Sequence, residues 1–510
     1  MGPRYLAPIS IGKATLAPAP RNALTPFMEQ GHVASRRTGP AAMASNTAES
    51  SPVLWNASAM PDDQCSPSER LERYQPKINP ARRPPRDAAR KWDGTPDHED
   101  RVEIGPTPLA FTEWQAAGLS PPNLDAMRQY RLNRIIAQLH DQHCAGVLLF
   151  DPLSIRYATD ATQMQLWNTH NPFRACLVTA DGYMVLWEYD GYAFLVEHLP
   201  LVREVRTGAA FFYFATGQRS EEKAKAFAHQ IDELMRARSG NNRRLAVDKI
   251  PIHGLRALDK LGFEILDGEE VMEKARAIKG PDEIKAMRCA IHACEQSIAE
   301  MQAITRPGLT EADIWAQLHA ANIRRGGEWI ETRILTSGQR TNPWFQECGP
   351  RILRNNEVLS FDTDLVGCYG ICTDISRSWF IGDGKPTDRQ RAMHAISYEH
   401  IMTNAELLKP GVTFKELCFG GHHLPEIYLP QRYSSKMHGV GLCDEWPSIK
   451  YPIDWEKAGY DGVLEPGMVL CVEVYLGEVG GPDGIKLEDQ VLVTETGFEN
   501  LTKCPFDPAL

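Results

Sequence analysis

One glutamate inside an apolar segment limits what this chain can fold into. Glu473 is surrounded, from Leu470 to Leu476, by side chains of the hydrophobic class. Such a run predicts a buried β-strand, in which a lone carboxylate would cost several kcal/mol of folding free energy. The protein is therefore expected to place a positive charge beside Glu473.

Further carboxylates and one imidazole lie in similar strand-like segments. These residues are Asp362, Asp364, Asp374, His438 and Glu488. Residues 359–364 read as a strand, so Asp362 and Asp364 are predicted to point to the same face. Asp374 follows in a second β-like run, which indicates a hairpin. Two carboxylates side by side on a buried strand repel each other unless a positive charge lies between them.

Each of these residues has an ordinary structural explanation when it is taken alone. A strand aspartate often faces solvent, and Glu488 can pair with Lys486 or Arg377. As a group that includes Glu473, however, the carboxylates and the imidazole suit a pair of divalent metal ions. Calcium alone would not need the histidine, and zinc sites more often use more nitrogen or sulfur ligands.

The composition excludes several other classes of function. The 66 acidic and 55 basic residues give a net charge of −11, which argues against a general nucleic-acid-binding protein. No segment approaches the roughly 20 apolar residues that a membrane-spanning helix needs. The 12 cysteines include no CxxC pair, which indicates reduced thiols and a cytoplasmic location.

A length of 510 residues predicts two or three domains. Residues 1–100 are rich in proline and alanine and are expected to form a disordered extension. Their basic bias up to Asn46 is compatible with an organellar targeting segment, and a later start at Met43 is the alternative. Residues 101–270 alternate helix-like and strand-like segments, as in an α/β domain. Residues 271–510 begin with helices and then become mostly β.

Apolar spacing predicts where the main elements lie. Helices are expected at 124–143, 220–238, 281–304, 310–325 and between 388 and 409, and strands at 146–150, 175–179, 183–187 and 245–249.

The order Asp, Asp, His, Glu, Glu resembles that of the "pita-bread" creatinase/aminopeptidase family over about residues 105–505. The motifs that carry the resemblance are Ala277-Ile-Lys-Gly-Pro-Asp-Glu-Ile284, Leu464-Glu-Pro-Gly-Met468 and Leu487-Glu-Asp-Gln-Val-Leu-Val-Thr-Glu-Thr-Gly497. The resemblance implies an α+β fold in which a C-terminal pita-bread metal-binding domain follows a smaller α/β creatinase-type N-terminal domain. It also implies a homodimer, in which the partner's N-terminal domain helps to shape the site.

The sequence differs from the peptidases of this family at two positions that affect the chemistry. Peptidases have a single aspartate at the first metal position, whereas this chain has both Asp362 and Asp364. They also carry a second histidine downstream of the metal histidine, and here Asp444 stands in the matching stretch. With both changes, the chain resembles a narrower branch of the family, the dimethylsulfoniopropionate (DMSP) lyases of the DddP type. In that branch the three aspartates, the histidine and both glutamates bind two metals, commonly iron, although manganese, zinc or cobalt also suits such ligands.

The resemblance implies a reaction that agrees with the residues. Metals that hold the DMSP carboxylate would acidify the adjacent Cα–H, and Asp444 would remove that proton as a general base. Dimethyl sulfide then leaves and acrylate forms. The sulfonium needs aromatic faces, for which Tyr433 and Trp167 are the candidates. A solvated loop acid, for Asp444, and packed or surface aromatic residues remain the alternatives.

Two other functions stay open from the sequence alone. One is a metallopeptidase of the Xaa-Pro type, and the other is a metal-free pita-bread binding protein. The complete set of ligand residues favours the metal-dependent enzyme over the binding protein.

Overall fold

The computed structural model describes residues 105–162, 164–196 and 198–510, all within one compact unit. The extension predicted for residues 1–100 lies outside the described residues. No helix in the described ranges is both long and apolar enough to cross a membrane.

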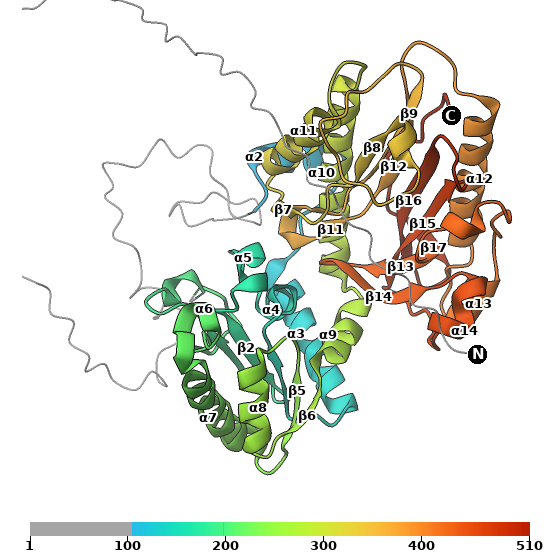
Figure 1. Ribbon diagram of the computed structural model, residues 1–510. Helices are drawn as coiled ribbons and strands as arrows, with labels where there is room; N and C mark the ends of the chain where they lie inside the picture. Colours follow the sequence, from blue (N-terminus) through green and yellow to red (C-terminus); the bar gives the residue numbers. More distant parts are fainter. Residues whose placement is uncertain (1–104, 163, 197) are drawn as a thin grey trace, which may run out of the picture. The chain divides into compact units, whose positions relative to one another are not determined.

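The N-terminal part is built on a six-stranded mixed sheet (Figure 1). In sheet order its strands are β4 (Glu204–Arg206), β3 (Met184–Trp187), β2 (Ala175–Thr179), β1 (Gly146–Leu149), β5 (Arg244–Val247) and β6 (Glu264–Asp267). The central strand β1 pairs antiparallel with β2 and parallel with β5. All of its residues are buried, as expected for a strand that has helices on both faces.

Helices cover both faces of this sheet. Successive side chains of a strand point to opposite faces, so neighbouring residues of β1 belong to different hydrophobic cores. Val147 belongs to the hydrophobic core that includes side chains of α3 (Leu124–Asp141) and α9 (Gly268–Ala277). Leu148 belongs to the core that includes side chains of α7 (Ser220–Ser239) and α8 (Ile252–Lys260). The helices α4 (Pro152–Thr159), α5 (Gln165–His170) and α6 (Tyr213–Thr216) also belong to this part. The first described helix, α2 (Pro108–Ala116), instead lies against α10 (Pro281–Ile304) of the C-terminal part, where Trp114 Nε1 donates a hydrogen bond to the backbone oxygen of Cys289 (Figure 1).

The C-terminal part contains three antiparallel sheets. The first has the order β14 (Asp444–Ile449), β13 (Met437–Val440), β15 (Val469–Gly477), β16 (Gly484–Val493) and β17 (Phe498–Asn500). The second has the order β12 (Ser376–Ile381), β9 (Glu357–Asp362) and β8 (Leu335–Ser337), and the third β11 (Cys372–Thr373), β10 (Leu365–Val366) and β7 (Trp329–Ile330).

Helices on opposite sides cover these sheets (Figure 1). They are α10 (Pro281–Ile304) and α11 (Glu311–Arg324) on one side and α12 (Asp388–Ala405) on the other, with the short α13 (Phe414–Phe419) and α14 (Trp455–Ala458) nearby. Along β15, Val472 and Val474 belong to the same core as residues of α12. The alternate positions, including Cys471 and Glu473, therefore face the other way, into the space where the site lies.

Candidate metal centre

The five-stranded sheet places two glutamates directly opposite each other. Glu473 on β15 and Glu488 on β16 are cross-strand partners, and both are fully buried. Two like charges at facing positions repel strongly in a dry environment. A cation beside the pair offsets this repulsion, and the ammonium of Lys486 lies within 3.0 Å of both glutamates.

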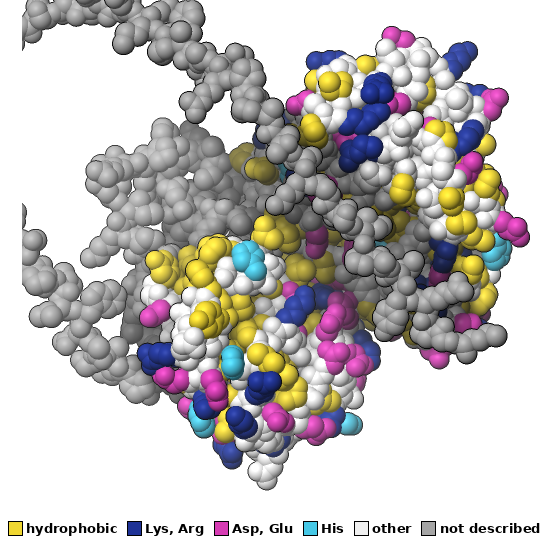
Figure 2. Space-filling view, in the orientation of Figure 1, with side chains coloured by type: hydrophobic (Ala, Val, Ile, Leu, Met, Phe, Trp, Pro, Cys, Tyr) yellow, Lys and Arg dark blue, Asp and Glu magenta, His cyan; other side chains and the backbone are white. Residues whose placement is uncertain are grey.

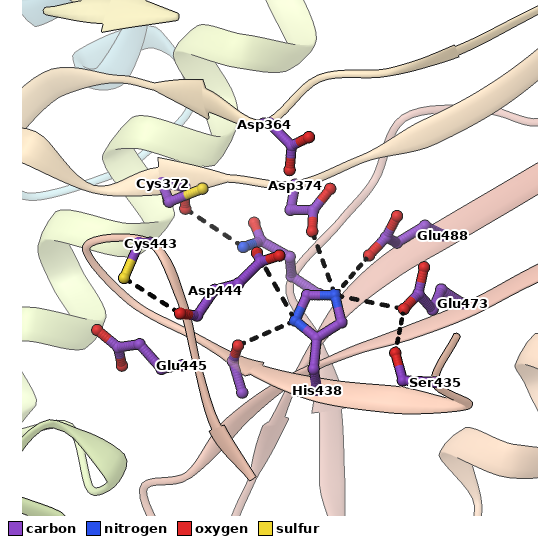
Figure 3. A network of polar contacts seen from close by, with 12 residues as sticks. Asp364, Cys372, Asp374, Ser435, His438, Cys443, Asp444, Glu445, Glu473 and Glu488 are labelled. Carbon is purple, nitrogen blue, oxygen red and sulfur yellow. Dashed lines mark hydrogen bonds and ion pairs between the residues drawn. The ribbon is translucent and has the colours of Figure 1, made fainter. Parts of the chain in front are cut away.

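His438 on β13 lies beside both glutamates (Figure 3). Its Nε2 lies 3.5 Å from Asp374 Oδ2, 3.4 Å from Glu473 Oε1 and 3.5 Å from Glu488 Oε1. Its Nδ1 lies 3.0 Å from the backbone oxygen of Gly439, which can accept a hydrogen bond when Nδ1 carries the proton. In that tautomer Nε2 directs its lone pair at the carboxylates, as a metal-binding histidine does.

Five of the six predicted residues fall into two groups whose ligand atoms lie within 4.8 Å of one another, and Asp374 belongs to both, whereas Glu473 is in neither group and contacts His438. The first group contains Asp374, His438, Cys471 and Glu488, and the second contains Asp362, Asp364 and Asp374. Cys471 joins the first group because it lies opposite His438 on β15. Cys471 was not among the residues expected at the site, although it is two residues before Glu473 and therefore on the same strand face.

The predicted strand at residues 359–364 is too long. Strand β9 ends at Asp362, and Asp364 has a φ of 34°, in the left-handed region that L-residues rarely adopt. The two aspartates are therefore not on one face of one strand. The turn after β9 nevertheless returns Asp364 to Asp374, and Thr332 Oγ1 holds it with a 2.7 Å hydrogen bond to Oδ2.

The donor set fits divalent metal ions. Asp362 Oδ1 and Asp374 Oδ1 are buried and have no hydrogen-bond partner, so their lone pairs remain available for a cation. Burial raises the pKa of Asp374 well above its usual range, and neighbouring carboxylates, Glu488 first, add to the increase. Burial also raises the pKa of Glu473, to about 8. Carboxylates that resist ionisation in this way become anionic readily when a metal neutralises them.

Lys486, expected from the sequence only as a potential partner of Glu488, lies at the centre of the site. Its Nζ contacts Asp362 Oδ2 at 2.9 Å, Glu473 Oε2 at 3.0 Å and Glu488 Oε2 at 2.6 Å. Lys486 and Glu488 are two residues apart on β16 and so share a face. This spacing was the available signal, but a lysine in a strand most often reaches solvent.

Asp444 is the first residue of β14, so the predicted loop position is corrected to a strand end. Its Oδ1 lies 3.7 Å from His438 Nδ1, and its side chain is 61% exposed. It faces a cavity of about 480 Å³ that also borders Asp364 and is lined by residues of both domains. Partial removal from bulk water raises the pKa of Asp444, and Glu488 adds to the increase, while His438 opposes it.

The two aromatic residues predicted to bind substrate differ in position. Tyr433 lies beside the cluster of carboxylates, where Lys486 Nζ is 4.5 Å from the centre of its ring and Phe345 stacks on it. Trp167 lies on α5 and contacts Phe214. Among the described residues of this chain, Trp167 is not one that lines the cavity beside Asp444.

Models of known protein families match both parts of the chain. The model of the creatinase/prolidase N-terminal domain matches residues 131–278, and that of metallopeptidase family M24 matches residues 285–495. The chain belongs to this family, and the predicted fold class is confirmed.

The chain is similar to two proteins named dimethylsulfoniopropionate lyase DddP. The one from Roseovarius nubinhibens is 59% identical over 85% of this chain and 97% of its own length, and the one from Roseobacter denitrificans is 58% identical over the same shares. Among solved structures, the dipeptidase PepE from Mycobacterium ulcerans has a TM-score of 0.59 at 21% identity, covering 75% of this chain and 97% of its own. The Xaa-Pro dipeptidase from Bacillus anthracis has a TM-score of 0.58 at 19% identity, covering 74% and 99%. The dipeptidases share the fold, and the similarity to the lyases identifies the chain as an enzyme.

Proposed function

We propose that this chain is a metal-dependent carbon–sulfur lyase that cleaves DMSP to dimethyl sulfide and acrylate. The observation that carries the proposal is the position of Asp444, a carboxylate that faces the cavity next to the metal centre. The similarity to two proteins named DMSP lyase supports the choice of substrate. The fold alone does not, because dipeptidases share it.

We assign the metal ligands to the six predicted residues. They are Asp362, Asp364, Asp374, His438, Glu473 and Glu488. Two divalent ions, with iron as the expected metal, would polarise the substrate carboxylate and stabilise the charge that develops next to it. Manganese, zinc or cobalt can also bind a set of five carboxylates and one imidazole.

Asp444 is the proposed general base. The Cα–H bond breaks, the proton goes to an Asp444 carboxylate oxygen, and the electron pair forms the C=C bond of acrylate. The C–S bond breaks with its electrons on sulfur, so the sulfonium leaves as neutral dimethyl sulfide. A carboxylate whose pKa is raised above its usual value is a stronger base than one in water, which favours this step.

Tyr433 is the proposed aromatic contact for the sulfonium. Its ring already lies over a cation, the ammonium of Lys486, which supports a cation–π role for this side chain. Phe345, which stacks on Tyr433, holds the ring in place.

We also propose that the chain acts as a homodimer in the cytoplasm. The described cysteines are all free, which agrees with a reducing compartment. Exposed apolar side chains gather on and beside α5 and α6 (Figure 2). This apolar patch consists of Met164, Leu166, Trp167, Tyr213 and Phe214. A patch of this kind is typical of a protein–protein contact, through which Trp167 would reach the partner's cavity.

The dimer has a direct test. Phe214 is 71% exposed, and Phe214→Asp is expected to convert the protein to monomers in sedimentation-velocity runs because it puts a charge into the patch. Val479→Asp, an equally exposed position in the β15–β16 turn, should leave the mass unchanged. An unmodified protein that sediments as a monomer at micromolar concentration would refute the dimer.

The lyase itself is tested by headspace detection of dimethyl sulfide. Purified protein of known metal content is expected to release dimethyl sulfide from DMSP, and chelator-stripped protein is expected to lose that activity and regain it with Fe²⁺. A metal-loaded protein that releases none, but hydrolyses an Xaa-Pro dipeptide with Mn²⁺, would establish the peptidase instead. Purified protein that contains no metal would favour the binding protein.

A further inference from the structure

Lys486 makes more contacts with the proposed metal ligands than an ordinary ion pair would need. Its side chain is completely buried, and three separate carboxylates converge on its ammonium at 2.6–3.0 Å. A fourth contact, at 2.9 Å, goes to Ser376 Oγ, which in turn donates to Glu488 Oε2. The ammonium thus occupies the place towards which Asp362, Glu473 and Glu488 direct one oxygen each.

The charges of the site explain why a cation is needed there. The site gathers five carboxylates, of which four are buried and Asp364 is partly exposed; they are Asp362, Asp364, Asp374, Glu473 and Glu488. A buried charge without a partner is strongly destabilising. Two divalent ions supply four positive charges, and the ammonium supplies the fifth, so the metal-loaded site is neutral with Lys486 and anionic without it.

The two glutamates divide their oxygens between His438 and Lys486. Glu473 and Glu488 each turn one oxygen to His438 Nε2 and the other to Lys486 Nζ. The oxygens that face Lys486 are therefore engaged by an ammonium before any metal arrives. The aromatic rings of Tyr433 and Trp344, 4.5 and 6.0 Å from Nζ, favour a cation at this position as well.

We propose that Lys486 is a built-in counter-ion of the metal centre. It stabilises the metal-free protein by pairing with three ligands, and it weakens metal binding because an incoming ion must compete with, or lie beside, its positive charge. Lys486 is thus a positioning residue that sets metal affinity. This inference rests on the proposed metal centre and not on the lyase reaction, so it holds or fails independently of the substrate.

The test compares chelator-stripped native protein with Lys486→Met, an uncharged side chain of similar length. Calorimetric titration with MnCl₂ is expected to show at least about tenfold tighter binding in the variant. The melting temperature of the metal-free variant should fall by roughly 5–10 °C, because three carboxylates lose their partner. The rise in melting temperature on adding Mn²⁺ should therefore be larger than in the native protein. Unchanged or weaker Mn²⁺ binding would overturn the proposal.

Lys436→Met is the matched control. Lys436 is equally buried, on the segment that leads into β13, but its Nζ donates to the backbone oxygens of Leu417 and Gly420 and not to a carboxylate. Its loss should lower the melting temperature equally with and without Mn²⁺ and leave Mn²⁺ affinity unchanged.

Lys486→Arg keeps the charge and covers the case in which Lys486→Met does not fold without metal. It should retain native Mn²⁺ affinity within about threefold, because the competing charge is still present. Binding in Lys486→Arg that is tenfold tighter than native would overturn the proposal, since the charge could then not be the cause.

Discussion

Asp374→Asn is expected to remove both metal ions and all lyase activity. Asp374 is the residue that the two ligand groups share, so a neutral side chain weakens both positions at once. Metal analysis by mass spectrometry should give substoichiometric metal, and headspace assays should detect no dimethyl sulfide.

The metal-free form of this variant should be no less stable than metal-free native protein. Because the folded-state pKa of Asp374 is raised, this group costs stability progressively as the pH rises above its ordinary pKa of 3.8, and asparagine removes that cost. Asp383→Asn, which changes an exposed aspartate in the loop after β12, is the control and should retain metal and activity. Full metal content in Asp374→Asn would contradict the ligand assignment.

Asp444→Asn should lower kcat by about 10²- to 10⁴-fold while metal content stays native, because a general base typically contributes that much. Asparagine has a similar shape but cannot accept the Cα proton. Glu269→Gln removes another carboxylate from the wall of the same cavity, and it should keep activity within about threefold. A fully active Asp444→Asn variant would exclude Asp444 as the base even if dimethyl sulfide is the product.

The pH profile gives an independent reading of the base. Only ionised Asp444 can accept a proton, so the rate should fall as the pH drops through its pKa. Because that pKa is raised, the acid limb should have its midpoint above the ordinary value of 3.8. The residual activity of Asp444→Asn should lack this acid limb. If the variant keeps the pH profile of the native enzyme, the acid limb belongs to another group.

Local pattern located several of the main helices and strands and indicated the residue types of the site. The helix predicted at 281–304 is confirmed at both ends because its apolar spacing is regular and Gly280-Pro281 marks its start. The strand predicted at 359–364 was wrong at its end, because nothing local shows that the chain turns after Asp362.

The predictions for the site residues also differ in outcome. The six proposed ligands come together, but their roles, and those of Asp444 and Tyr433, stay predictions. The absence of Trp167 from the cavity of its own chain could not be foreseen, since a single sequence does not show which domain faces which.

The sequence by itself determined that carboxylates and a histidine interrupt buried strands, and that such residues require a cation. Alternation along a strand is local, so it can be read from neighbouring residues. Only the tertiary structure decided that Glu473 and Glu488 face each other, that Asp374 is shared, and that Lys486 points into the site. These facts depend on strand register and on the packing of distant segments, which balance burial against charge over the whole domain.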